Sequence, residues 1–169
     1  HMAELTSVEG TDRAAEVAKA AWKTKGDTQS LLIFRNAVDE QFAVPLGLVQ
    51  RIEKIKRSQI EEVGGKRVIQ YRGGTLPLSA IEEVAQVKPL ADQEDIIVIV
   101  FLVSNREAGL LATGPVDAME VPVTFDETTL RQKGIMGSAI IAEQTTLLVD
   151  IYDVMKTLYP HWFTERQIA

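Results

Sequence analysis

Residues 70–78, with the sequence QYRGGTLPL, indicate the fold most directly. Their glycine pair, Gly73-Gly74, stands between strand-like runs at 67–71 and 75–78, and a second pair, Gly64-Gly65, lies nine positions earlier. Glycine readily adopts the positive φ angles of two-residue hairpin turns, so this region is predicted to be a three-stranded meander. Pro77 has no N–H to donate to a sheet ladder, and we expect its strand to lie at an edge or to carry a bulge.

Short strands separated by turns are predicted on both sides of the meander. They cover residues 31–34 and 42–46 before it, and 96–103, 110–112, 135–142 and 146–149 after it. Helical segments are expected at 80–84 and 151–159, the second capped by Asp150 and stopped by Pro160. The extension 1–29 is expected to hold an amphipathic helix at 11–25, and its first residues, His1-Met2, are typical of a cloning remnant.

The two halves of the chain resemble each other in sequence. At a spacing of 67 residues, Val44, Gly47, Val49, Ile52 and Glu53 correspond to Leu111, Gly114, Val116, Met119 and Glu120. At a spacing of 71, residues 75–78 correspond to 146–149. These matches suggest an internal duplication, although short matches among Val, Leu and Gly also arise by chance. Two small antiparallel barrels side by side would suit such a repeat, because closure removes exposed strand edges.

The composition restricts the class of protein. The 169 residues fit one domain or two very small ones. The net charge of −6 argues against a nucleic-acid partner, and the absence of cysteine excludes disulfides and thiolate zinc sites. The longest apolar run, 96–103, has eight residues, too few for a membrane-spanning helix. We therefore expect a soluble, cytoplasmic protein without direct membrane insertion.

No pattern in the sequence predicts a catalytic residue, a metal site or a cofactor. There is no phosphate-binding glycine loop, no nucleophile elbow and no kinase motif. His161 is the one histidine outside the cloning remnant. It is a candidate general base, but no orienting partner is evident, and packing of the aromatic cluster 159–163 at the chain end is the alternative. The basic residues around 54–57 and 66–67 are read as a solvated strand face.

The pattern Arg72-Gly73 followed by Pro77 resembles the CheW-like domain of bacterial chemotaxis. The coupling protein shares this domain with the C-terminal regulatory domain of the chemotaxis histidine kinase, CheA. Residues 134–151 resemble the last hairpin of the family, and the similarity covers about 30–159. The resemblance implies an all-β fold with short helices, built as two SH3-like five-stranded β-barrel subdomains. We place these at about 30–90 and 91–159 within a CheW-like domain spanning 30–163.

The function that this resemblance implies is that of a non-catalytic adaptor. Such a domain couples the cytoplasmic tips of chemoreceptors to the histidine kinase and pairs with a coupling-protein homologue. Arg72, Gly73 and Pro77 would belong to its protein-binding surface. Further candidates for apolar interface residues are Val49, Ile52, Val116 and Met119. The alternative for these four is plain burial in the core.

Three other interpretations remain open at this stage. Residues 61–65 and Gln70-Tyr71 look more like the kinase's regulatory domain than like the free coupling protein, so the chain could be a regulatory fragment of the kinase. Residues 3–29, however, do not resemble the ATP-binding domain that precedes it there. A β-barrel module for nucleic acid or a small ligand would require a basic or aromatic stripe on one face. A small hydrolase would depend on His161.

Overall fold

The structure is a computed structural model that describes residues 28–122 and 124–163. These residues form a mostly β fold with short helices. The expected fold class is confirmed at this level. The helix expected at 11–25 lies outside the described residues. The strands are β1 (Gln29–Arg35), β2 (Gln41–Pro45), β3 (Val49–Lys56), β4 (Glu61–Val63), β5 (Lys66–Tyr71), β6 (Gly74–Ser79), β7 (Asp95–Val103), β8 (Arg106–Val121), β9 (Ile135–Ile141) and β10 (Gln144–Val149). They are accompanied by α2 (Ile151–Leu158) and by short 3-10 helices at Leu46–Leu48, Arg57–Gln59 and Ile81–Glu83.

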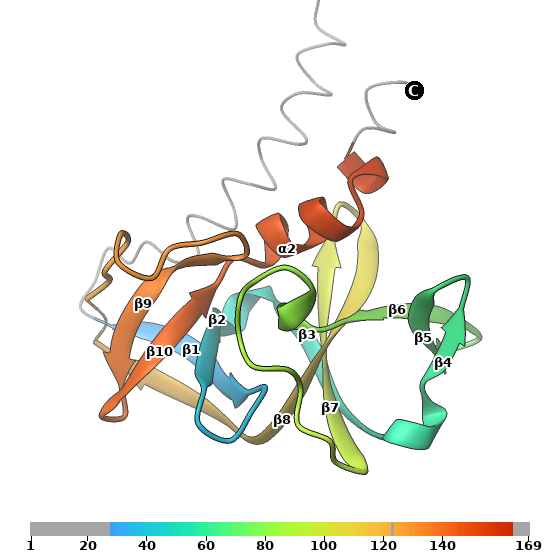
Figure 1. The fold of residues 1–169 in the computed structure, drawn as a ribbon, viewed down its shortest axis with the longest axis horizontal. Coiled ribbons are helices and arrows are strands. Elements are labelled where there is room, and N and C mark those ends of the chain that lie inside the picture. The colour runs from blue at the N-terminus through green and yellow to red at the C-terminus, as the bar shows by residue number, and fades with distance from the viewer. Residues whose placement is uncertain (1–27, 123, 164–169) are drawn as a thin grey trace, which may run out of the picture.

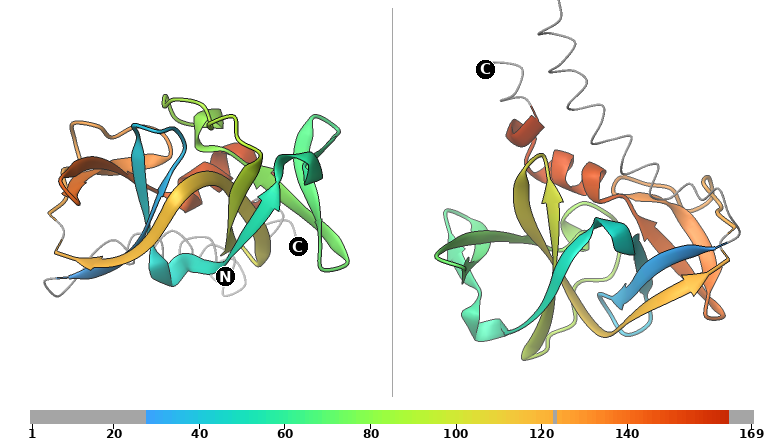
Figure 2. Two further views of the ribbon diagram at one scale, coloured as in Figure 1. Left: turned by 90° about the horizontal axis from the view of Figure 1, so that it is seen from below. Right: turned by 180° about the vertical axis from the view of Figure 1, so that it is seen from behind.

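Strand β8 connects two groups of strands. Its first half pairs with β7 and, in parallel, with the end of β6, whereas its second half pairs with β1. The strands follow the order β4-β5-β6-β8-β1-β2-β10-β9, and β7 also pairs with β3. Figures 1 and 2 show β8 crossing from one half of the molecule to the other. Because β1 and β2 pair with β8 and β10, hydrogen bonding crosses the expected subdomain boundary near residue 90.

Three clusters of buried side chains stabilise this arrangement. The central cluster includes Phe34, Phe42, Ile99, Phe101 and Trp162, and α2 contributes Ile151, Val154 and Met155 to it. The second cluster lies under the meander and includes Ile69, Leu76, Leu78, Val98 and Leu111. The third cluster includes Leu31, Ile33, Ala43, Ile141 and Leu148. Figure 1 shows α2 lying between β10 and the β7–β8 turn.

Strands β1 and β7 are buried on both faces. In β1, Leu31 and Ile33 point to the third cluster while Leu32 and Phe34 point to the central one. Successive side chains of a strand face opposite sides, so each face of β1 contacts a different cluster. This explains why the two strands read as continuous apolar runs without alternation.

The strands β3 and β8 differ from expectation. No strand is predicted around Val49 and Ile52, but this region forms β3, which pairs with β7 and has a register shift near its start. The run expected at 110–112 extends over the whole of Arg106–Val121. Pro115 would normally end such a strand, but it lies where the pairing with β1 is interrupted, between Thr113 and Asp117.

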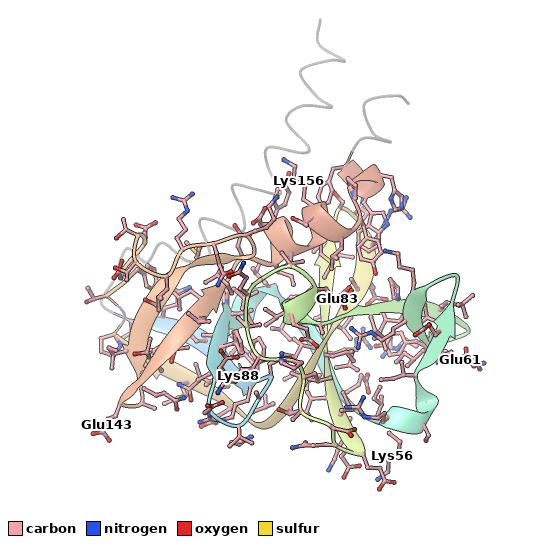
Figure 3. All side chains as sticks on the ribbon, viewed as in Figure 1. Lys56, Glu61, Glu83, Lys88, Glu143 and Lys156 are labelled. Atoms are coloured by element: carbon pink, nitrogen blue, oxygen red, sulfur yellow. The ribbon has the colours of Figure 1, made fainter. Side chains whose placement is uncertain are left out.

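The connection from residue 86 to 94 is bonded to the β1–β2 turn through one buried side chain. Asn36 is fully buried, and its Nδ2 donates to Glu82 Oε1 at 2.8 Å and to the Lys88 carbonyl at 2.7 Å. The Ala91 N–H donates to the Asn36 carbonyl at 2.7 Å. Lys88 also forms an ion pair with Asp39. Figure 3 shows Lys88 near the middle of the view, whereas Glu61 and Glu143 lie toward its opposite sides.

Candidate protein-binding site

Arg72 and Gly73 form the two-residue turn that joins β5 to β6. Their φ angles are +52° and +78°, and Tyr71 and Gly74 form the closing pair of the hairpin. Positive φ at both central residues is the geometry of a type I′ turn, whose twist matches that of the flanking strands. The turn therefore lies one residue earlier than the glycine pair suggested. It holds the Arg72 side chain exposed, with the guanidinium 5.5 Å from the centre of the Tyr71 ring.

Strand β6 is paired along only part of one edge. It pairs with β5 from Gly74 to Leu78, but with β8 only at Leu78 and Ser79. In a two-residue hairpin the closing pair is hydrogen-bonded, and the following pairs are alternately non-hydrogen-bonded and hydrogen-bonded. Thr75 and Pro77 belong to non-hydrogen-bonded pairs, so their backbone groups point away from β5. Pro77 thus lies where β6 begins to separate from β8. This position agrees with the expectation that its strand is at an edge.

A cleft of about 440 Å³ opens where β6 and β8 separate. One wall is the exposed end of the hairpin with the edge of β6 from Gly74 to Pro77. The other wall is the β7–β8 turn and the start of β8, residues 105–107, and Trp162 also lines the cleft. The expected binding residues Arg72 and Pro77 are therefore brought together with residues that are distant in sequence.

Trp162 packs closely against its neighbours. Its indole stacks on the Tyr159 ring, with a centroid distance of 4.3 Å and an interplanar angle of 8°. The Arg106 guanidinium lies 5.7 Å from the centre of the Trp162 ring, and the Lys66 ammonium lies 5.2 Å from that of Tyr159. These contacts join the end of the described chain to β5 and to the β7–β8 turn. Trp162 is 6% exposed, so one wall of the cleft is part of the packed core.

The hydroxyl of Tyr71 is held in its neutral form. Burial raises the pKa of Tyr71, and the carboxylates of Glu53 and Glu107 raise it further, while Arg51 acts in the opposite direction. The neutral hydroxyl donates to Glu53 Oε2 at 3.3 Å. This bond connects β5 to β3 and orients the ring on which Arg72 rests.

The four apolar candidates from the sequence do not form one surface. Val49 and Val116 are partly buried against the central cluster, and Met119 packs against the third cluster. Only Ile52, on β3, is exposed among them, at 44% of its surface. For the other three, the geometry gives more support to the core alternative than to an interface.

No metal centre or membrane helix is evident in the part of the chain that the structure describes. Residues 28–122 and 124–163 hold no group of three or more His, Cys, Asp or Glu residues that could bind a metal ion. None of the described helices is long and apolar enough to cross a membrane. His161 is exposed, and its ring lies 6.3 Å from the ring centres of Tyr159 and of Trp162. It belongs to the aromatic group at the chain end.

Sequence reasoning missed Arg106 and Trp162 as components of the site. Both segments were recognised, Arg106 in a turn and Trp162 in an aromatic cluster, but nothing in the sequence linked either to Arg72. The link depends on β8 pairing in parallel with the end of β6, since that pairing places the β7–β8 turn opposite the hairpin. An arginine in a turn and a tryptophan near a chain end carry no signal of a shared site.

Comparison with known proteins gives two matches. The family model of the CheW-like domain matches residues 30–158. Among solved structures, the chain is similar to the scaffolding protein TtCheW from Thermoanaerobacter tengcongensis, with a TM-score of 0.60 and 13% sequence identity. That alignment covers 73% of this chain and 85% of the other. At this identity, the structural match supports a common fold.

Proposed function

The chain belongs to the CheW-like domain family, a family of non-catalytic scaffolding domains, and on this basis we propose that it is a chemotaxis adaptor. It would couple the cytoplasmic tip of a chemoreceptor to the chemotaxis histidine kinase, and would therefore act in the cytoplasm. The observation that carries the proposal is the exposed Arg72-Gly73 turn beside a cleft, in a domain that matches the family over residues 30–158.

The proposed architecture is one CheW-like domain with two five-stranded barrel subdomains. The second and third clusters support two separate interiors, and the central cluster lies between them. One subdomain would contain β3, β5, β6, β7 and the first half of β8, with the three-residue β4 paired to the outer edge of β5. The other would contain β1, β2, β9 and β10 with the second half of β8. Each subdomain would then draw strands from both sides of residue 90, and the two would share β8.

The proposed partner surface is centred on Arg72, Gly73 and Pro77, with Ile52 as an outlying apolar contact. Arg72 is exposed on a turn of defined geometry, which fixes the direction in which its side chain leaves the backbone. Exposed apolar groups beside a charged anchor are common at protein interfaces. Val49 and Val116, which pack against the central cluster, and Met119, which packs against the third, would lie outside this surface.

Two kinds of protein in the family would fit the proposed adaptor function: the free coupling protein and the regulatory domain of the kinase. Both would use the same surface toward the receptor. The coding sequence that flanks this chain decides between them. A kinase ATP-binding domain encoded upstream would assign the chain to the kinase.

The proposal is tested by binding of the whole chain to a receptor signalling fragment and to the histidine kinase. We expect Arg72→Glu to weaken binding to at least one partner by about 2 kcal/mol, roughly 30-fold in Kd, if the arginine is central to the interface. Arg131→Glu is the matched control, because Arg131 is also exposed but lies outside the cleft. Failure of the unmodified chain to bind either partner would refute the adaptor function.

A further inference from the structure

We propose that the cleft between β6 and the β7–β8 turn binds an extended, acidic segment of a partner protein, which adds as a strand to the open edge of β6. This inference rests on the proposed function in one respect, since Arg72 belongs to the same partner surface. It adds the conformation of the bound segment, its charge and two further binding residues, Arg106 and Trp162.

The first argument concerns the backbone. The closing pair Tyr71 and Gly74 sets the alternation of hydrogen bonds, so the N–H and the carbonyl of Thr75 face the cleft. Strand β8 does not reach them, because its pairing with β6 begins only at Leu78. An extended peptide that enters the cleft can exchange backbone hydrogen bonds with Thr75, as in other cases of strand addition.

The second argument concerns charge. The protein carries a net charge of −6, yet the charged side chains that line the cleft are Arg72, Arg106 and the single acid Glu107. The two guanidinium groups come from the two turns that face each other across the cleft, and each lies near an aromatic ring. A guanidinium presents a planar fork of donors that matches a carboxylate. The cleft is therefore a local site for an acidic side chain on an otherwise acidic molecule.

The third argument concerns shape. Trp162 and the Leu76–Pro77 edge give the cleft an apolar part beside the two arginines. In an extended segment, neighbouring side chains point to opposite faces and every second one shares a face. An alternating segment can thus direct carboxylates toward the arginines while its backbone follows β6. A helix cannot make the same backbone bonds, because its own N–H groups are already paired.

The test uses the full chain and synthetic octapeptides with blocked ends. The acidic probe is Thr-Val-Glu-Val-Glu-Val-Thr-Thr, and the neutral probe replaces both Glu residues by Gln. Titrations are followed by the backbone amide signal of Thr75 and the indole N–H signal of Trp162. We expect the acidic probe to shift both signals in a saturable way and the neutral probe to bind at least ten-fold more weakly.

Variants then separate backbone pairing from side-chain contact. Thr75→Pro removes the N–H on the open edge and should abolish binding, whereas Thr75→Val keeps that N–H and should bind within about two-fold of the unmodified chain. Arg72→Gln and Arg106→Gln should each weaken binding of the acidic probe at least five-fold. Because these two variants leave the backbone of β6 intact, they keep the test valid if Thr75→Pro does not fold.

Several outcomes would overturn the proposal. These are the absence of a shift at Thr75 with millimolar peptide, equal affinity for the two probes, or unchanged affinity in both arginine variants. The receptor fragment and the kinase are titrated in parallel. Normal binding of these proteins without binding of the acidic probe overturns the cleft proposal alone, whereas loss of all three overturns the proposed function as well.

Discussion

Replacing Asn36 by aspartate tests the buried bonds between the β1–β2 turn and the connection 86–94. The substitution preserves size but places an oxygen where Nδ2 now donates to Glu82 Oε1 at 2.8 Å and to the Lys88 carbonyl at 2.7 Å. An ionised carboxylate at this fully buried position would face another carboxylate and a carbonyl oxygen. We therefore expect the introduced carboxyl group to remain protonated in the folded protein, which means that its pKa is raised.

The expected cost follows from this protonation. In the unfolded chain this carboxyl group releases its proton at about pH 3.9. Keeping the proton bound in the folded protein near pH 7 costs about 1.36 kcal/mol for each pH unit above that value, or about 4 kcal/mol in total. A single O–H also replaces two N–H donors, which adds about 1 kcal/mol for the lost hydrogen bond. The Asn36→Asp protein should thus be about 5 kcal/mol less stable than the unmodified protein near pH 7. That is a large part of the total stability of a typical domain.

The sign of the pH dependence follows from the same linkage. The folded variant binds one proton more than its unfolded chain, so its stability relative to the unmodified protein falls as the pH rises above about 4. Urea unfolding near pH 5.5 and near pH 7 should show a difference of about 2 kcal/mol, with the variant less impaired at the lower pH. The matched control is Asn105→Asp, the same chemical change at an exposed turn residue, which should stay within about 0.5 kcal/mol at both pH values.

A loss below about 1 kcal/mol, or a loss with no pH slope beyond the control, would refute the reasoning. Either result would mean that the carboxylate is solvated, and hence that the connection does not cover Asn36. If the variant is unfolded near pH 7, the slope is measured from lower pH, where the expected loss is smaller.

Three further predictions concern single positions. A Cβ at Gly109 would lie 2.6 and 2.8 Å from two methyl carbons of the second cluster, so Gly109→Ala should cost about 1–3 kcal/mol in urea unfolding. Gly47→Ala, with nothing within 4 Å, should be nearly neutral. Gly73→Ala places a side chain at φ +78° and should destabilise the hairpin by about 1 kcal/mol. Gly74→Ala should cost less stability, because the added Cβ would make only an ordinary contact. A larger loss for Gly74→Ala than for Gly73→Ala would contradict the assigned turn. Hydrogen bonds from the backbone of the two following threonines hold the pKa of Asp126 well below its usual range, so its contribution to stability should be present above about pH 4 and lost as the pH falls further. An NMR titration of its carboxyl should show an ordinary pKa only if the turn that it caps is not formed.

The local parts of the fold could be predicted because their causes are local. The Gly64-Gly65 turn has φ angles of +60° and +79°, which glycine adopts without steric cost. The helix α2 is capped as expected, with the Asp150 side chain accepting from the Asp153 N–H. Strand β3 was missed because Val49, Ile52 and Ile55 are three residues apart, and the register shift near its start breaks the two-residue alternation.

The candidate site was predicted in part. The Arg72-Gly73 turn and Pro77 were identified from their sequence, through their resemblance to a family. Of the apolar candidates, Ile52 is exposed, but Val49 and Val116 pack against the central cluster. Apolar residues on a half-buried strand give the same sequence signal whether they face the core or a partner, because burial depends on what covers them.

The sequence by itself determined the class of fold, the places of the turns to within about one residue, the last helix and the family. These follow from residue chemistry that acts over a few positions, such as the positive φ of glycine and the missing N–H of proline. Only the tertiary structure decided that β1 and β2 pair with β8 and β10, and that Arg72 lies across a cleft from Arg106 and Trp162. The physical reason is that β1 and β7 are apolar on both faces, so their pattern cannot specify their neighbours. Their pairing is selected by how the three buried clusters pack together as a whole.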